Sequence, residues 1–132
     1  MKTMSTVLLA ALVAFTLACG YSSKATTPPT AGSTPAIDTL APDNMNAGGA
    51  AFVLTVNGSN FSTKSTINWN GTAQTTTYVS TSQLTATISA ADIANAATVP
   101  ITVTNPATSG TGIYGSGGTM AETSSAMNFT VN

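Results

Sequence analysis

Side chains that could do chemistry are scarce in this chain. Its charged residues are, in full, Lys2, Lys24, Lys64, Asp38, Asp43, Asp92 and Glu122, and histidine is absent. Covalent catalysis usually needs a nucleophile beside a base, and no imidazole is present to act as that base. Serine–lysine or paired-carboxylate chemistry remains formally open. Because the four carboxylates are scattered singly along the chain, we predict that the protein is not an enzyme.

The same scarcity bears on ligands and partners. Nucleic-acid affinity comes largely from several Lys and Arg side chains that neutralise phosphates, so we expect no nucleic-acid partner. Residues 43–46, Asp-Asn-Met-Asn, offer oxygen ligands but lack the further carboxylates and the final Glu of a calcium loop. A turn held by the Asp43 side chain is the favoured interpretation. We expect no metal and no cofactor.

The only cysteine directly follows an apolar run near the start of the chain. Lys2 supplies a positive charge, residues 7–18 are apolar except for Thr16, and Ala18 precedes Cys19. A charged start, an apolar stretch of about 7–15 residues and a small residue before the cut make up a secretory signal. We therefore predict a signal peptide over residues 1–18. A retained transmembrane helix is disfavoured, because a span needs about 20 apolar residues.

Residues 16–19, Thr-Leu-Ala-Cys, resemble the lipobox of bacterial lipoproteins. Ala18 and Cys19 match its usual form of Leu, Ala or Ser, Gly or Ala, and Cys, whereas Thr16 and Leu17 depart from it. The resemblance implies that Cys19 is acylated, for example with palmitate. The alternative is an ordinary secretory cut after Ala18. We expect an exported lipoprotein held by its lipid anchor in a membrane, at the outer membrane or the cell surface.

Residues 19–34 have almost no large apolar side chain to bury, and they contain two prolines, Pro28 and Pro29. Prolines favour an extended, semi-stiff chain. We predict a lipid-anchored flexible linker over residues 19–34 that lifts a folded domain, residues 35–132, off the membrane. The alternative is an irregular first strand.

Short runs of alternating apolar and polar residues follow, separated by Gly, Asn and Ser. The runs cover residues 52–57, 67–70, 84–88, 99–103 and 127–131. This alternation predicts strands with one buried face, which belong to antiparallel sheets stacked as a sandwich. Trp69 is in phase with Ile67, so we place it in the core. Asn70-Gly71 predicts a tight hairpin turn.

Two shorter features refine this prediction. Ser89 and Asp92 have the spacing of a helix N-cap and its third residue, which predicts one short helical turn between two strands. Pro100 lies inside a strand pattern. Either its strand is an edge strand or its nitrogen faces away from the ladder of hydrogen bonds.

Several motifs carry a family resemblance. They are residues 35–42 between two prolines, the Gly48-Gly49 pair, residues 52–61 ending in Gly-Ser-Asn-Phe, and residues 67–72 ending in Asn-Gly-Thr. Together with the later strands, they resemble the IPT/TIG domain over residues 35–132. The resemblance implies an all-β, immunoglobulin-like antiparallel β-sandwich. It implies no single function, because the family serves in receptors, transcription factors, adhesins and spacer modules.

Exposed aromatic rings are the remaining candidates for a binding site, because flat rings with polar groups grip sugars or peptides. Tyr114 lies in a glycine-rich segment, residues 110–118, and end loops of sandwiches commonly carry recognition. At Tyr78-Val79, either side chain could face inward. We expect a non-enzymatic interaction, adhesion or spacer module, with a possible protein or polysaccharide partner. The alternative is a carbohydrate-binding module that uses Tyr114 and Tyr78.

Overall fold

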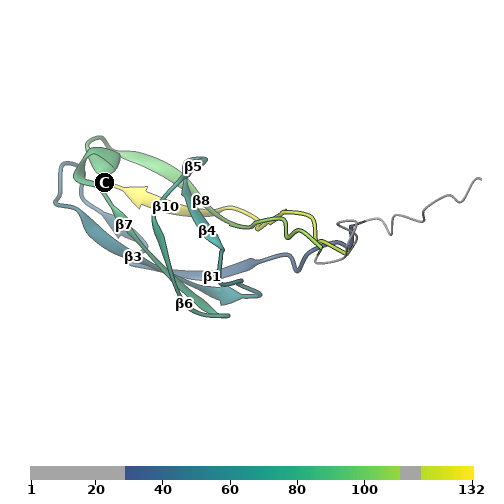
Figure 1. Ribbon diagram of the computed structural model, residues 1–132. Helices are drawn as coiled ribbons and strands as arrows, with labels where there is room; N and C mark the ends of the chain where they lie inside the picture. Colours follow the sequence, from purple (N-terminus) through teal and green to yellow (C-terminus); the bar gives the residue numbers. More distant parts are fainter. Residues whose placement is uncertain (1–28, 111–116) are drawn as a thin grey trace, which may run out of the picture.

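The computed structural model describes residues 29–110 and 117–132. These residues form two β-sheets that pack face to face (Figure 1). One sheet has the strand order β1-β3-β7-β6, with every neighbour antiparallel. Its strands are β1 (Ala36–Ala41), β3 (Phe52–Ser59), β7 (Gln83–Ile88) and β6 (Thr76–Ser80).

The other sheet has the strand order β2-β10-β8-β4-β5, and β9 also pairs with β8. Its strands are β2 (Asn44–Met45), β10 (Met127–Val131), β8 (Ala97–Asn105), β4 (Thr66–Trp69), β5 (Thr72–Ala73) and β9 (Glu122–Thr123). β2 pairs with β10 in parallel, and the remaining pairings in this sheet are antiparallel. The predicted all-β sandwich is therefore confirmed.

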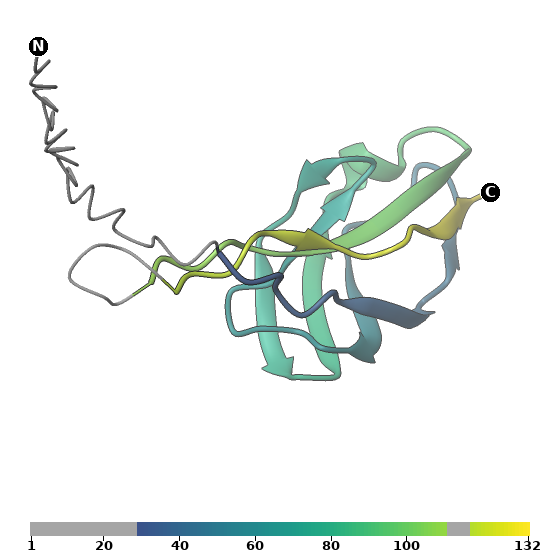
Figure 2. The same cartoon turned by 90° about the vertical axis from the view of Figure 1, so that its right-hand side faces the viewer.

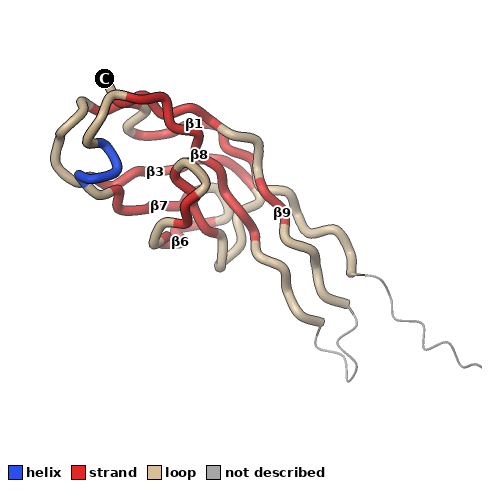
Figure 3. Tube along the Cα trace, turned by 90° about the horizontal axis from the view of Figure 1, so that it is seen from above, coloured by secondary structure: helices blue, strands red, loops and turns tan. Residues whose placement is uncertain are grey.

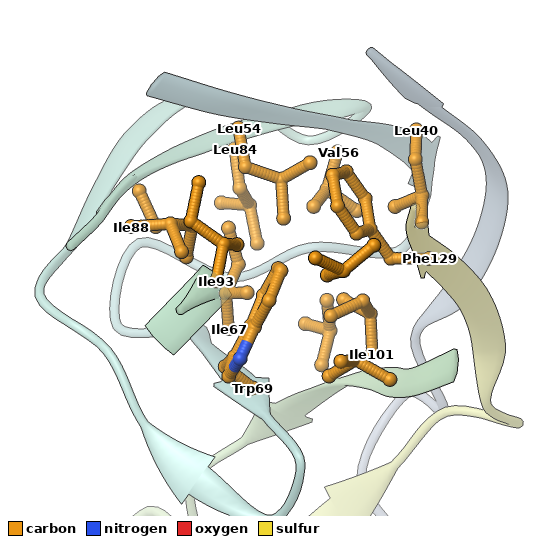
Figure 4. Packing of buried hydrophobic residues seen from close by; sticks show 14 of the residues in the cluster. Leu40, Leu54, Val56, Ile67, Trp69, Leu84, Ile88, Ile93, Ile101 and Phe129 are labelled. Atoms are coloured by element: carbon orange, nitrogen blue, oxygen red, sulfur yellow. The ribbon is translucent and has the colours of Figure 1, made fainter. Parts of the chain in front are cut away.

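The alternation of residues along each strand fills the space between the sheets. Leu54, Ile67, Leu84 and Phe129 are fully buried, and Figure 4 shows them meeting in one cluster. Full burial of side chains of this size stabilises a fold by about 1.5–3 kcal/mol each. The apolar inward faces of the strands thus supply a core sufficient for one domain.

Trp69 lies in this core, as predicted. It is 4% exposed, and its ring centroid lies 5.0 Å from that of Phe129. Phe129 also stacks on Phe52, with centroids 5.6 Å apart. Aromatic pairs at such distances add about 0.5–1.5 kcal/mol beyond area burial. Trp69 is therefore a packing residue and not an exposed platform for a ligand.

Two local predictions are confirmed. Asn70 and Gly71 have φ values of 49° and 80° and connect β4 to β5 through the pair Trp69–Thr72. Positive φ at both central residues is the geometry of a tight hairpin turn. The 3-10 helix η1 (Ala90–Ile93) begins with the reciprocal hydrogen bonds of a capping box between Ser89 and Asp92, and it links β7 to β8.

Pro100 corrects one of the alternatives drawn from the sequence. Its strand β8 lies between β10 and β4, so the interpretation as an edge strand is wrong. The Pro100 carbonyl accepts a hydrogen bond of 3.0 Å from the backbone N–H of Asn70. Because N–H and C=O of one residue point to the same side of an extended strand, the proline nitrogen faces the turn after Trp69, where β4 has ended.

The two ends of the sandwich differ. At one end, residues 29–34, 106–110 and 117–121 run outward side by side (Figure 2), and we call these three segments the arm. At the other end, which we call the far end, η1 and residue 132 meet the connection between β2 and β3. There, the N–H of Gly48 donates to the Ile93 carbonyl at 2.8 Å, and the N–H of Ala47 donates to the Asn132 carbonyl at 2.6 Å. The chain therefore enters the sandwich at one end and reaches residue 132 at the opposite end.

Candidate functional site

A groove with a volume of about 1060 Å³ lies where the arm leaves the sandwich. Residues 59–64 and 81–82 of two strand connections line one part of it. Residues 32–33, 105–109 and 119–120 of the arm and the end of β8 line the rest. Pockets for small ligands commonly have volumes of about 300–1,000 Å³. The groove is therefore the main candidate site of the described residues.

The connection after β3 owes its shape to the sequence Gly-Ser-Asn-Phe at residues 58–61. A side chain at Gly58 would clash with the Ala36 carbonyl oxygen and lie 2.8 Å from the Phe61 ring, so only glycine lets β1 pass this closely. Asn60 has a φ of 61°, a conformation that asparagine tolerates better than most residues. Phe61, 3% exposed, anchors the connection in the core. One wall of the groove is thus fixed by local sequence.

The Asn105 side chain joins this wall to the arm. Its amide nitrogen donates to the carbonyls of Ser33 at 2.7 Å and Asn60 at 2.8 Å. Its amide oxygen accepts a hydrogen bond from the Ser65 hydroxyl and a longer one, 3.4 Å, from the Ser62 N–H. Asn105 is 6% exposed, and buried amides are stable only when they are hydrogen-bonded in this way. The groove is therefore built on a rigid floor.

The arm is held by backbone pairing among its three segments (Figure 3). Thr30 donates its N–H to Gly118 at 3.1 Å and accepts from Met120 at 3.1 Å. Thr108 and Thr119 exchange backbone hydrogen bonds of 3.0 and 3.1 Å. Residues 29–34, the described part of the predicted linker, thus lie against the segments that flank residues 111–116.

The groove offers hydrogen bonds but no acid–base pair. Its lining is rich in serine and threonine, and Lys64 is the one charged side chain among the residues that line it. Asp38 and Asp92 lie on β1 and η1 and do not line the groove. Glu122 on β9 is not a lining residue either, although its side chain lies beside the lining residue Gly32 and accepts a hydrogen bond of 3.4 Å from the Thr34 hydroxyl. Within the described ranges, no three His, Cys, Asp or Glu side chains gather as a metal ion requires. The groove can therefore hydrogen-bond a polar ligand through its hydroxyl groups and the Lys64 ammonium group.

Of the two tyrosines predicted to form a site, the structure describes Tyr78. Tyr78 is half-buried on β6 and packs against the core, whereas its neighbour Val79 is 52% exposed. Tyr78 is thus the inward residue of the pair. Tyr114 and Cys19 lie outside the described residues.

The predicted turn at Asp43 lies at the far end. The Asp43 carboxylate accepts a hydrogen bond of 2.7 Å from the side-chain amide of its neighbour Asn44, and both residues are exposed. The backbone here joins β10, because the N–H of Thr130 donates to the Asp43 carbonyl at 3.2 Å. The segment therefore serves to bring β2 alongside β10.

Among the described residues, no helix is long and apolar enough to cross a membrane.

Comparison with known families agrees with this geometry. A family model described as the IPT/TIG domain matches residues 35–121. The chain belongs to the IPT/TIG domain family. Curated proteins and solved structures were also compared with the chain, and neither comparison gave a match. Domains of this family typically serve as interaction or spacer modules and are generally non-catalytic.

The IPT/TIG sandwich extends beyond the matched residues. β10 starts at Met127, and its five residues pair with β8. Phe129 and Val131 of β10 are buried in the core. The folded unit therefore reaches Val131, as the sequence pattern of residues 127–131 indicates.

The groove was not predicted from the sequence. The predicted binding segment was residues 110–118, whereas the described residues that line the groove flank that segment and include residues 59–64 and 81–82, which are remote in sequence. The sandwich topology could have indicated the groove, because the connections at one end of an antiparallel sandwich lie close together. The buried Asn105 had a clearer signal, since it follows Val99, Ile101 and Val103 at the inward positions of β8.

Proposed function

We propose that this IPT/TIG protein is an exported, lipid-anchored surface protein whose sandwich acts as a non-catalytic spacer and presents its far end for interaction. The supporting observation is that the chain enters at the arm and reaches residue 132 at the opposite end (Figure 2). β8, with nine residues, spans about 30 Å along this direction. An anchor at Cys19 would therefore leave the far end raised above the membrane.

The distribution of polar groups favours a spacer over an enzyme. The described carboxylates lie on separate elements, and the groove contains a single charged side chain. General acid–base catalysis needs groups placed within hydrogen-bond reach of one reacting atom. No such pair lines the groove. The sandwich instead offers a rigid core and two distinct ends.

The anchor can be tested by metabolic labelling with radioactive palmitate and by membrane fractionation. We expect the wild-type protein to carry label and to sediment with membranes. Cys19→Ala should abolish the label and release the protein into the soluble fraction, because Ala18 still permits an ordinary secretory cut. Ser22→Ala, three residues later, is the matched control and should behave as wild type. A Cys19→Ala protein that remains on the membrane and labelled would contradict the proposal.

A second candidate, carbohydrate binding, is supported by the groove itself. Its hydroxyl-rich lining lies beside the ends of the segment that contains Tyr114. Hydroxyl and amide groups suit a neutral sugar, and a tyrosine ring would add a stacking surface. Tyr78 packs against the core and is not among the residues that line the groove, so its hydroxyl group would be reached only by a ligand that extends beyond the groove.

Retention on insoluble polysaccharides and on a glycan array would test this candidate. Tyr114→Ala should abolish retention, and Tyr78→Phe, which keeps the ring in the core, isolates the contribution of the hydroxyl group. Thr130→Ala, on an exposed position of β10 remote from the groove, is the control. Absence of retention by the wild-type chain would remove carbohydrate binding and would leave the spacer proposal in place.

A further inference from the structure

The edge strands of the two described sheets are not equally protected. β2, β5 and β9 have two residues each, too short to accept a partner strand. β1 carries the exposed Asp38, a register shift between Ile37 and Thr39, and a proline on either side. Short length, charge, bulges and proline are the usual means by which proteins prevent unwanted pairing at sheet edges. The edges at β1, β2, β5 and β9 are therefore blocked.

β6 is the exception. Its five residues, Thr-Thr-Tyr-Val-Ser, include no charge and no proline, and most have high strand propensity. A register shift between Tyr78 and Ser80 is its one protective feature, and it leaves Thr76, Thr77 and Tyr78 in regular register with β7. An edge strand presents unpaired backbone N–H and C=O groups to solvent. β6 thus offers a neutral, extended template to an added strand.

We propose that β6 pairs with β6 of a second copy of this chain in antiparallel orientation. A two-fold contact brings the same strand against itself, and the absence of charge in β6 means that no like charges oppose each other. In the antiparallel register that pairs all five residues, Tyr78 faces Tyr78 and Thr77 faces Val79, and aromatic pairs of this kind stabilise adjacent strands. The two four-stranded sheets would then form one continuous sheet of about eight strands, a width still common in sheets.

The direction of β6 determines how the arms of the two copies would be oriented relative to each other. Thr81 and Ser82, which directly follow β6, line the groove at the arm, and the Ser82 carbonyl accepts from the N–H of Gly58 at 2.9 Å. β6 therefore runs toward the arm. Antiparallel pairing reverses one copy, so that the two arms leave at opposite ends. Given the proposed anchor on the arm side, on which this step rests, the pair would bridge two facing membranes.

The size of the contact predicts its strength. A stable protein interface buries about 1,200–2,000 Å² of surface. One pair of five-residue strands buries less surface than this. A single pair should therefore dissociate readily in solution. Many anchored copies on two facing surfaces would compensate, because linked contacts form at a high effective concentration.

Sedimentation equilibrium of the chain from Gly20 onward, which retains every described residue, tests the edge contact. Val79 on β6 is 52% exposed, and Val53 on the interior strand β3 is 57% exposed. We expect the wild type and Val53→Lys to show the same concentration-dependent dimer. Val79→Lys should weaken dimerisation at least about tenfold, because charged side chains block edge pairing. Circular dichroism should show that both variants keep the fold.

Two results would overturn the edge contact. One is a wild-type chain that stays monomeric up to millimolar concentration. The other is an equal loss of dimer in Val53→Lys, which would assign the contact to the face of the sheet instead of its edge.

Vesicle clustering tests the bridging arrangement separately. The same chain, attached through an N-terminal histidine tag to vesicles with nickel-chelating lipids, should cluster them and raise turbidity. Val79→Lys should abolish clustering, and Val53→Lys should preserve it. Dimers in solution without vesicle clustering would overturn the bridging arrangement. Because the tag replaces the lipid, neither result depends on acylation of Cys19, whose failure would show only in the labelling experiment.

Discussion

Asn105 connects three parts of the chain that are remote in sequence. Its side-chain amide bonds to Ser33 on the arm, to Asn60 after β3 and to Ser65 before β4. Asn105 and Ser65 are both buried, so their hydrogen bond satisfies polar groups that would otherwise lack a partner away from water. One buried amide therefore fixes the position of the arm relative to the sandwich.

Asn105→Ala should lower the free energy of unfolding by about 1–3 kcal/mol, because the buried Ser65 hydroxyl loses its acceptor and the Ser33 and Asn60 carbonyls lose a donor. Urea unfolding followed by Trp69 fluorescence measures this loss. Asn68→Ala is the control, since Asn68 bonds only to the side chains of Thr102 and Thr104 on the outer face of its sheet. An Asn105→Ala protein within about 0.5 kcal/mol of wild type would refute the proposed role.

Single residues differ in how far the sequence predicts their role. Phe61 and Trp69 follow from apolar phase and from the Gly-x-x-Phe motif, and both are buried. Asn105 was missed because asparagine is common in the turns of this chain, and polar residues are mostly exposed. Its partners come from segments whose proximity depends on the tertiary fold, so local pattern alone could not identify the network.

The hairpin between β4 and β5 is an element that local sequence specifies almost completely. Gly71 has a φ of 80°, and a side chain added there would meet no atom within 4 Å. Any cost of Gly71→Ala thus comes from the backbone conformation and not from a clash. The hairpin also brings Gln74 back to β4, where its N–H donates to the Ile67 carbonyl at 2.8 Å.

Gly71→Ala should destabilise the protein by about 1–2 kcal/mol, the cost of a left-handed conformation for a residue with a side chain. Thermal unfolding, with the melting temperature as the readout, measures the effect. Thr72→Ala, at the next and exposed position, should change stability by less than about 0.5 kcal/mol. Equal stability of the two variants would show that the turn relaxes at no cost.

The positions of the strands in the sequence could be predicted more reliably than the pairing of the strands within each sheet. The alternation of residues 99–103 correctly predicted β8 but left open whether it lies at an edge. Its pairing with β10 and β4 joins residues distant in sequence, and the proline is tolerated because β4 ends one residue earlier. The same limit applies to the groove, whose walls come from connections that only the sheet order brings together.

At the scale of the whole molecule, the path of the chain suggests resistance to pulling. After β1, the chain leaves the first sheet, and β2 joins the second sheet in parallel with β10. Backbone bonds join the two, from Thr130 to the Asp43 carbonyl at 3.2 Å, from Asn132 to Met45 at 2.9 Å and from Ala47 to Asn132 at 2.6 Å. A pull between residues 29 and 132 acts along both strands. These bonds then have to shear together instead of opening one after another.

A single-molecule pulling experiment with handles at residues 29 and 132 should therefore give a higher unfolding force than handles on Thr72 and Thr77, where β5 and β6 would be peeled from their sheet edges. Ala47→Pro removes one donor of the β2–β10 pairing and should lower the first force, although the equilibrium free energy of unfolding should fall by only about 1 kcal/mol. Ala50→Pro, three residues beyond the pairing, is the matched control for the proline itself.

If Ala47→Pro and Ala50→Pro unfold at the same force as the wild type, the parallel pair bears no load, and the core alone determines mechanical strength. If only Ala47→Pro is weakened, the connection between the two sheets is the part of this spacer that resists tension between an anchored arm and a bound far end.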